Sequence, residues 1–168
     1  LMHESRYSLE IANLILGGGW MSRLIKEVRE KRGWAYHIGS GVTHFLDVGD
    51  VSIGAGLPKD KLDDAVGLIT EICYGLGGAN NWKITSDEIE IAKDTFRGRF
   101  ALTLDKPENV LGMALDNLMF EGEIKTPKEI LDNIEKVSLK DVQKVCDLIF
   151  KPENLSISVV GDYKKLNF

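Results

Sequence analysis

The stretch that decides the fold is VREKRGWAY, Val28–Tyr36, where a predicted helix ends and a predicted strand begins. Just before it, apolar residues recur at helical spacing and predict a buried stripe on a helix over 21–31: Met21, Leu24, Ile25 and Val28. Gly33 follows the last helical turn, in the position that glycine favours just past a helix C-terminus. The chain is then expected to enter a strand directly.

Arg29 and Tyr36 stand on the two sides of this junction. Arg29 falls on the last turn of the helix and Tyr36 early in the strand, so the two side chains can face one space. Polar groups carried by two rigid elements are suited to hold a peptide carbonyl or a developing oxyanion. The alternative is a solvated helix face, because the basic residues of segment 23–32 are interleaved with Glu27 and Glu30. Spacing alone leaves both interpretations open.

Strands are predicted in three places. Segments 34–45 and 48–57 are rich in glycine, serine, threonine and β-branched residues, and they predict an antiparallel pair with Asp47 near its turn. Segment 155–160 (LSISVV) alternates apolar and polar residues before it becomes wholly apolar, and it predicts a third strand that ends at Gly161.

Helical patterns occupy most of the remaining chain. Apolar spacing predicts helices over 4–16, 59–77, 85–100 and 108–120, and capping residues indicate two more that begin after Thr126 and Ser138. Thr85 with Glu88 indicates a capping box at the start of the third of these helices. The order of elements predicts an α+β domain, a mostly antiparallel sheet with helices packed on one face. Three strands make a thin sheet for so many helices, so strands upstream of Leu1 are expected to be missing.

Length and composition limit the kind of protein. The 168 residues fit one domain, 1–168, and 21 Lys and Arg against 26 Asp and Glu give a net charge of −5. A domain that grips phosphates is usually basic, so nucleic acid is not expected as a partner. No apolar run approaches the roughly 18 residues of a membrane span. Cys73 and Cys146 lie in apolar helical stretches and are expected to be buried free thiols in a reducing compartment.

The histidines do not form a metal-binding pattern. His3 would begin a zinc motif only with a second histidine at position 7, which is Tyr7, and the inverted motif fails at Arg6 as well. His37 and His44 are an odd number of residues apart on a predicted strand, so they would point to opposite faces, roughly 23 Å apart. No metal and no other cofactor is therefore expected within this chain.

The triple glycine Gly17–Gly19 precedes a predicted helix, where free N–H groups could attract a phosphate. A phosphate-binding loop would follow a strand and continue into Gly-Lys-Ser/Thr, and neither feature is present. A helix C-terminus with a tight turn into the next helix is the favoured interpretation. An anion- or nucleotide-binding module remains the weakest of the functional alternatives.

Two segments in particular carry a resemblance to a known family: LGGGWMSRL (16–24) and VREKRGWAY (28–36). Together they resemble the second-half domain of the pitrilysin/insulinase zinc peptidases, the M16 family, which includes mitochondrial processing peptidase. The similarity continues through the strand pair, GAG (54–56), ITSDE (84–88) and Ala92-Lys93, and it ends at NLSISVVGD (154–162). It covers nearly the whole chain in the order of the family.

This resemblance implies a LuxS/processing-peptidase-like metallohydrolase half-domain. Family members are clamshells of two homologous α+β halves, one of which carries a His-x-x-Glu-His zinc site and a distal glutamate. The other half supplies an arginine and a tyrosine, which match Arg29 and Tyr36 here. Their implied roles are to orient the substrate carbonyl and to hydrogen-bond the tetrahedral oxyanion. This chain departs from the family in having no zinc motif, and it is expected to lack the first strands of the family fold.

The sequence therefore predicts the noncatalytic, substrate-binding half of a zinc-dependent metallopeptidase, inactive alone and a fragment of a longer peptidase. Its expected partners are a homologous zinc-bearing half, as domain or subunit, and a peptide, with neither nucleic acid nor a membrane. A bacterial-type cytoplasmic location is expected ahead of the mitochondrial matrix. The alternative is a structural scaffold related to core proteins of a respiratory complex, although a scaffold has no need for Arg29 and Tyr36.

Overall fold

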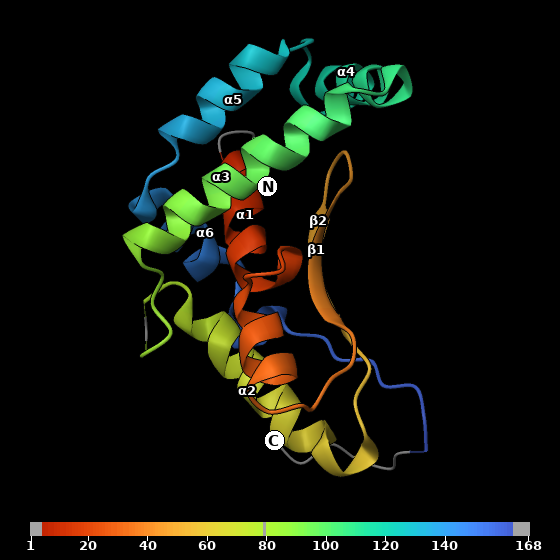
Figure 1. Cartoon of the computed structure of the whole chain (residues 1–168), viewed down its shortest axis with the longest axis vertical. Helices are drawn as coiled ribbons and strands as arrows, with labels where there is room; N and C mark the ends of the chain where they lie inside the picture. Colours follow the sequence, from red (N-terminus) through yellow and green to blue (C-terminus); the bar gives the residue numbers. More distant parts are fainter. Residues whose placement is uncertain (1–4, 79, 163–168) are drawn as a thin grey trace.

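The computed structural model describes residues 5–78 and 80–162 of the chain. These residues form an α+β fold, in which the helices lie on one side of an antiparallel hairpin (Figure 1). Helix α1 (Arg6–Asn13) lies at the centre, where it packs against the hairpin on one side and against other helices on the other. The predicted fold class is confirmed. No helix in this part of the chain is long and apolar enough to cross a membrane.

The helices follow the predicted order. After α1 come the π-helices η2 (Leu14–Gly18) and η3 (Ile25–Glu30), and the short 3-10 helices are η4 (Lys59–Lys61) and η5 (Pro152–Asn154). The remaining α-helices are α2 (Leu62–Gly75), α3 (Ser86–Leu104), α4 (Pro107–Glu121), α5 (Pro127–Lys136) and α6 (Leu139–Ile149). The N-termini of α3, α5 and α6 are closed by full capping boxes from Thr85, Thr126 and Ser138, as the capping residues predict.

Strands β1 (Ile38–His44) and β2 (Gly49–Ala55) pair antiparallel, from Ile38 opposite Ala55 to His44 opposite Gly49. The predicted hairpin is thus confirmed, and its turn is closed by the Phe45 N–H, which donates to the Val48 carbonyl over 2.8 Å. The prediction that the first strand begins at residue 34 is wrong. The last bond between the two segments joins the Gly56 N–H to the His37 carbonyl, so residues 34–36 have no ladder partner in the described part of the chain.

The predicted third strand, 155–160, is not formed among the described residues. The segment is exposed throughout and carries no ladder, although the backbone at Leu155 is extended. A strand needs a neighbour to bond its backbone N–H and carbonyl groups, and among the described residues β1 and β2 pair only with each other. The alternation of apolar and polar residues in this segment therefore does not produce a strand, because no neighbouring strand pairs with it in the described part of the chain.

Met21 is also placed differently from the prediction. It was expected in the buried stripe of a helix over 21–31, but it is 75% exposed. The Ser22 N–H donates to the Gly19 carbonyl over 3.0 Å, which closes a four-residue turn with Trp20 and Met21 at its centre. Helical structure begins only at Arg23, and from there Leu24, Ile25 and Val28 are buried as predicted.

The core lies between α1 and its neighbours. Its fully buried large side chains include Leu9, Ile11, Leu16, Leu24, Val28, Ile72, Leu76, Ile134 and Val142. Cys73 and Cys146 are buried among them as free thiols, which confirms the prediction for both. Burial raises the pKa of each thiol to about 12.

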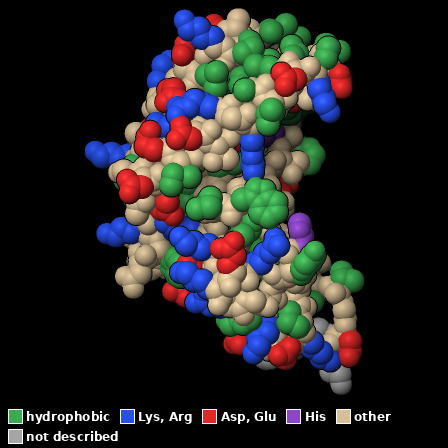
Figure 2. Space-filling view, viewed as in Figure 1, with side chains coloured by type: hydrophobic (Ala, Val, Ile, Leu, Met, Phe, Trp, Pro, Cys, Tyr) green, Lys and Arg blue, Asp and Glu red, His purple; other side chains and the backbone are tan. Residues whose placement is uncertain are grey.

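An apolar surface is exposed at the end of the molecule formed by α4. Figure 2 shows hydrophobic side chains gathered there, and the exposed residues of this helix include Leu111, Leu115, Leu118 and Met119. Among the residues of α4 only Asn117 is buried. This surface belongs to a different element from the one that carries Arg29.

Candidate functional site

Arg29 is positioned by the end of η3. The Gly33 N–H donates to the Arg29 carbonyl and the Trp34 N–H to the Val28 carbonyl, each over 3.0 Å. This pattern closes a helix C-terminus with a residue in the left-handed region, and Gly33 has a φ of +64°. The predicted role of Gly33 is confirmed. The last turn that carries Arg29 is therefore held firmly against the segment that leads to Tyr36.

Tyr36 lies in the bend that precedes β1, and its side chain is exposed, at 89% for the residue. The Arg29 guanidinium carbon lies over its ring, 5.6 Å from the ring centroid. At this distance a guanidinium and an aromatic face attract each other. The two residues predicted to share one space thus do so, although Tyr36 stands before the strand and not within it.

Trp20 is a second aromatic residue at this place, and sequence reasoning did not assign it to the site. The Arg29 guanidinium carbon also lies over the Trp20 ring, 5.9 Å from its centroid. Trp20 is 75% exposed because it is a central residue of the turn that the Gly19 carbonyl and Ser22 N–H close. The available signal was a large aromatic residue directly after three glycines, where a turn puts side chains into solvent.

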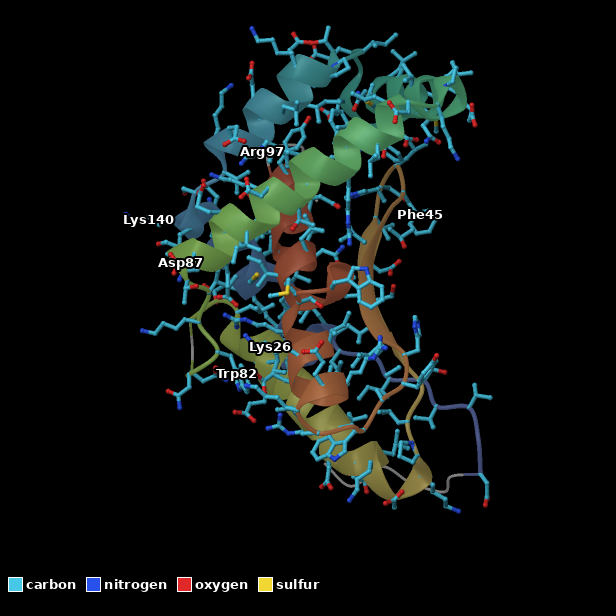
Figure 3. All side chains as sticks on the ribbon, viewed as in Figure 1. Lys26, Phe45, Trp82, Asp87, Arg97 and Lys140 are labelled. Carbon is cyan, nitrogen blue, oxygen red and sulfur yellow. The ribbon has the colours of Figure 1, made fainter. Side chains whose placement is uncertain are left out.

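The other charges on η3 leave the donors of Arg29 available. Glu27 binds Lys31 over 2.6 Å and Arg32 over 3.0 Å. Burial tends to raise the pKa of the Glu27 carboxyl, but these two cations outweigh it and hold that pKa below its ordinary value. Within residues 5–78 and 80–162 no carboxylate pairs with Arg29. Lys26, labelled on the same helix in Figure 3, adds a further exposed positive charge.

This arrangement fits a carbonyl or carboxylate ligand. A guanidinium that rests on aromatic faces keeps its five N–H donors in its own plane, where they can reach planar oxygen acceptors. The phenolic hydroxyl of Tyr36 is a second donor on an exposed ring. The site can therefore offer hydrogen bonds from two side chains to one oxygen-rich group.

The glycine turn is packed too tightly to cradle a phosphate. A Cβ at Gly17 would lie 2.6 Å from the backbone nitrogen of Ser40 on β1. The Gly18 carbonyl accepts a hydrogen bond from Arg99 over 2.6 Å. Gly17 and Gly18 end η2 before the extended Gly19, which confirms the predicted helix C-terminus and turn.

The described part of the chain contains no set of side chains that could bind zinc. No group of three or more His, Cys, Asp or Glu side chains lies close enough to hold a metal ion there. His37 and His44 lie near opposite ends of β1, and the cysteines are buried, protonated thiols. His3 lies outside the described residues. The side chains of the described residues therefore do not fit a zinc ion.

The family of this chain follows from its comparison with known protein families. The family model described as "Peptidase M16 inactive domain" matches residues 1–96, more than half of the chain. The chain belongs to the peptidase M16 family, as one of its inactive domains.

The curated relatives are longer than this chain. An uncharacterised zinc protease of Bacillus subtilis is 30% identical over 159 residues, which cover 95% of this chain and 38% of the relative. Another from Streptomyces coelicolor is 31% identical over 163 residues, which cover 96% and 34%. The chain thus spans about a third of the length of the curated relatives it matches.

Solved structures share the fold. A conserved protein from Enterococcus faecalis matches with a TM-score of 0.71 and 27% identity, over 84% of this chain and 32% of its own. An inactive peptidase domain from Bordetella parapertussis matches with a TM-score of 0.74 and 22% identity, over 91% and 81%. A chain of complex III2 from Candida albicans gives 0.70 and 16%, over 88% and 37%. At these identities the last two show the fold alone.

Proposed function

We propose that residues 1–168 form one noncatalytic, substrate-binding half-domain of a zinc-dependent M16 peptidase, in which Arg29 and Tyr36 contact the peptide. The observation that carries this proposal is the Arg29 guanidinium over the exposed Tyr36 ring, 5.6 Å from its centroid, with no carboxylate partner in the described part of the chain. A guanidinium that lies over an aromatic ring and has no carboxylate partner can use its N–H donors to bind an acceptor group of a ligand.

Arg29 orients the carbonyl of the peptide bond in this proposal, because its donors match a planar oxygen acceptor. Tyr36 donates its hydroxyl hydrogen to the oxygen that becomes negative when the carbonyl carbon is attacked. A donor aimed at the oxyanion lowers the barrier more than it tightens ground-state binding. The zinc ion and the water that it activates belong to a homologous zinc-bearing half, as domain or subunit.

The free, buried thiols support a reducing compartment such as a bacterial cytoplasm. A scaffold role is the second candidate, because the fold by itself is compatible with either role and also occurs in a chain of complex III2. A scaffold makes no use of Arg29 donors that lack a carboxylate partner among the described residues, so the peptidase function is supported better.

The test is peptide hydrolysis by the complete zinc-loaded protein, with and without a chelator. We expect chelator-sensitive cleavage that Arg29→Ala lowers by about 100-fold in kcat/KM, as loss of a transition-state donor does. Arg32→Ala is the matched control, because Arg32 sits one turn later but is paired with Glu27. Absence of cleavage across a broad peptide panel, by a folded and zinc-loaded sample, would favour the scaffold instead.

A further inference from the structure

Two large apolar side chains beside the proposed site are held in solvent. Trp20 and Met21 are adjacent in sequence, and each is 75% exposed. They are the two central residues of the turn that the Ser22 N–H and Gly19 carbonyl close. Single exposed apolar residues are ordinary on a protein surface, but here Trp20 also contacts the Arg29 guanidinium, so the pair adjoins a donor group of the proposed site.

The turn that carries this pair is fixed on both sides. Before it, Gly17 packs so closely on β1 that a Cβ would lie 2.6 Å from the Ser40 nitrogen. Arg99 of α3 also binds the Gly18 carbonyl over 2.6 Å. After it, Arg23 binds Glu88 at the start of α3 over 2.7 Å. Trp20 and Met21 are therefore presented by a turn that is anchored to both the hairpin and a helix.

Trp20 connects this apolar pair to the donors of the site. The Arg29 guanidinium carbon lies 5.9 Å from its ring centroid. A carbonyl oxygen bound to that guanidinium would lie about 2.9 Å from one of its nitrogens. Consecutive Cα atoms of the peptide are only about 3.8 Å apart, so a side chain next to that carbonyl can reach the ring.

We propose that Trp20 and Met21 form an apolar subsite, which takes an apolar side chain of the peptide whose carbonyl Arg29 holds. This inference rests on the proposed function and adds a substrate class to it: peptides with an apolar residue next to the carbonyl that Arg29 binds. Trp20 supplies a rigid aromatic face, and Met21 supplies a flexible thioether that adapts to side chains of different shape.

The test uses the complete zinc-loaded peptidase and pairs of peptides that differ by Leu or Asn at one residue. The substitution is moved along the four residues around the cleaved bond, and kcat/KM is measured for each pair. We expect one position at which leucine is preferred, and Trp20→Ala to reduce that preference by about tenfold. Trp20→Phe should retain most of it, because phenylalanine keeps an aromatic face.

Two further variants distinguish a failure of the apolar subsite from a failure of the proposed function. Phe45→Ala removes another exposed aromatic ring, at the distal turn of the hairpin (Figure 3), and should leave the leucine preference unchanged. Arg29→Ala should lower kcat/KM for both peptides of a pair equally. If Arg29→Ala lowers both but Trp20→Ala leaves the preference intact, the subsite is refuted and the proposed function stands. If Arg29→Ala changes neither, the proposed function fails.

A binding measurement gives an answer that does not depend on turnover. Trp34→Phe with Trp82→Phe leaves Trp20 as the single tryptophan of this chain, so that its fluorescence can be followed. Where the rest of the protein contains tryptophans, they are replaced as well. We expect acrylamide to quench Trp20 freely, and a leucine-containing peptide to protect it more than its asparagine counterpart does. Equal protection by both peptides, or a Trp20 already shielded without peptide, would overturn the proposal.

Discussion

Arg23 and Glu88 bind each other through two parallel hydrogen bonds, Nε to Oε1 and Nη2 to Oε2, each 2.7 Å long. Arg23 is 9% exposed, and its guanidinium also donates to the carbonyls of Trp82 and Lys83. Glu88 meanwhile accepts from the Thr85 N–H as part of the α3 capping box. One carboxylate thus caps α3 and attaches it to the start of the segment that carries Arg29.

Replacing Glu88 by glutamine should destabilise the fold by about 1–3 kcal/mol, because Arg23 would remain buried without its ionised partner. Urea unfolding of the protein measures this loss. Glu90→Gln is the matched control, since Glu90 lies on the same helix with its side chain 66% exposed and bonds only loosely to Lys93. Equal effects of the two substitutions would show that the Arg23 pair contributes nothing specific.

The same pair should make stability depend on pH. Burial tends to raise the pKa of the Glu88 carboxyl, but hydrogen bonds from Arg23 and Thr85 and the charge of Arg23 outweigh it, so the folded pKa lies below the ordinary 4.5. A lowered folded pKa means stability that is present above pH 4.5 and is lost as pH falls through the folded value. The difference in unfolding free energy between the native protein and Glu88→Gln should therefore shrink on acidification. A constant difference down to about pH 3 would contradict this assignment.

Much of this architecture is local and could be predicted from the sequence. The capping boxes and the Gly33 helix end depend on residues within one turn of each other, and all of them formed as predicted. The prediction of a strand over 155–160 is wrong because a strand needs a neighbouring strand, and the pattern of the segment itself does not specify one. The prediction that Met21 is buried is wrong because a turn follows the three glycines, although the helical spacing of apolar residues extends back to Met21.

The candidate site could also be predicted only in part from the sequence. Arg29 and Tyr36 could be brought together from sequence because they flank one helix end, seven residues apart. Trp20 reaches the same guanidinium only through the fold of the glycine turn and its anchors on β1 and α3. A contact that depends on tertiary packing leaves no periodic signal in the chain.

Gly17→Ala should destabilise the protein by about 2 kcal/mol or more, because the new Cβ would meet backbone, 2.6 Å from the Ser40 nitrogen, and backbone cannot rotate away. Gly98→Ala is the matched control on α3, where a Cβ meets nothing within 4 Å. That change should stabilise by about 0.5–1 kcal/mol, as alanine does in an exposed helix. Thermal unfolding distinguishes them, and a neutral Gly17→Ala would show that η2 and β1 are less tightly packed.

The two cysteines should resist thiol reagents while the protein is folded. Their pKa of about 12 leaves roughly one thiol in ten thousand ionised at pH 8, and burial blocks access as well. Reaction with a chromogenic disulfide reagent should be slow in buffer and should reach two thiols from this chain in urea. Rapid labelling of either cysteine in buffer would mean that α2 or α6 opens readily.

Tyr36→Phe in the complete peptidase should lower kcat by about 100-fold while KM changes much less, because the lost hydroxyl acts in the transition state under the proposed function. The ring that lies over Arg29 is retained, so the substitution isolates the hydroxyl from the stacking contact. Tyr74→Phe removes a hydroxyl from α2, from a ring that is not among those the Arg29 guanidinium covers, and should leave both constants unchanged. A rise in KM at constant kcat would instead make Tyr36 a ground-state contact, and unchanged kinetics would remove its hydroxyl from the mechanism.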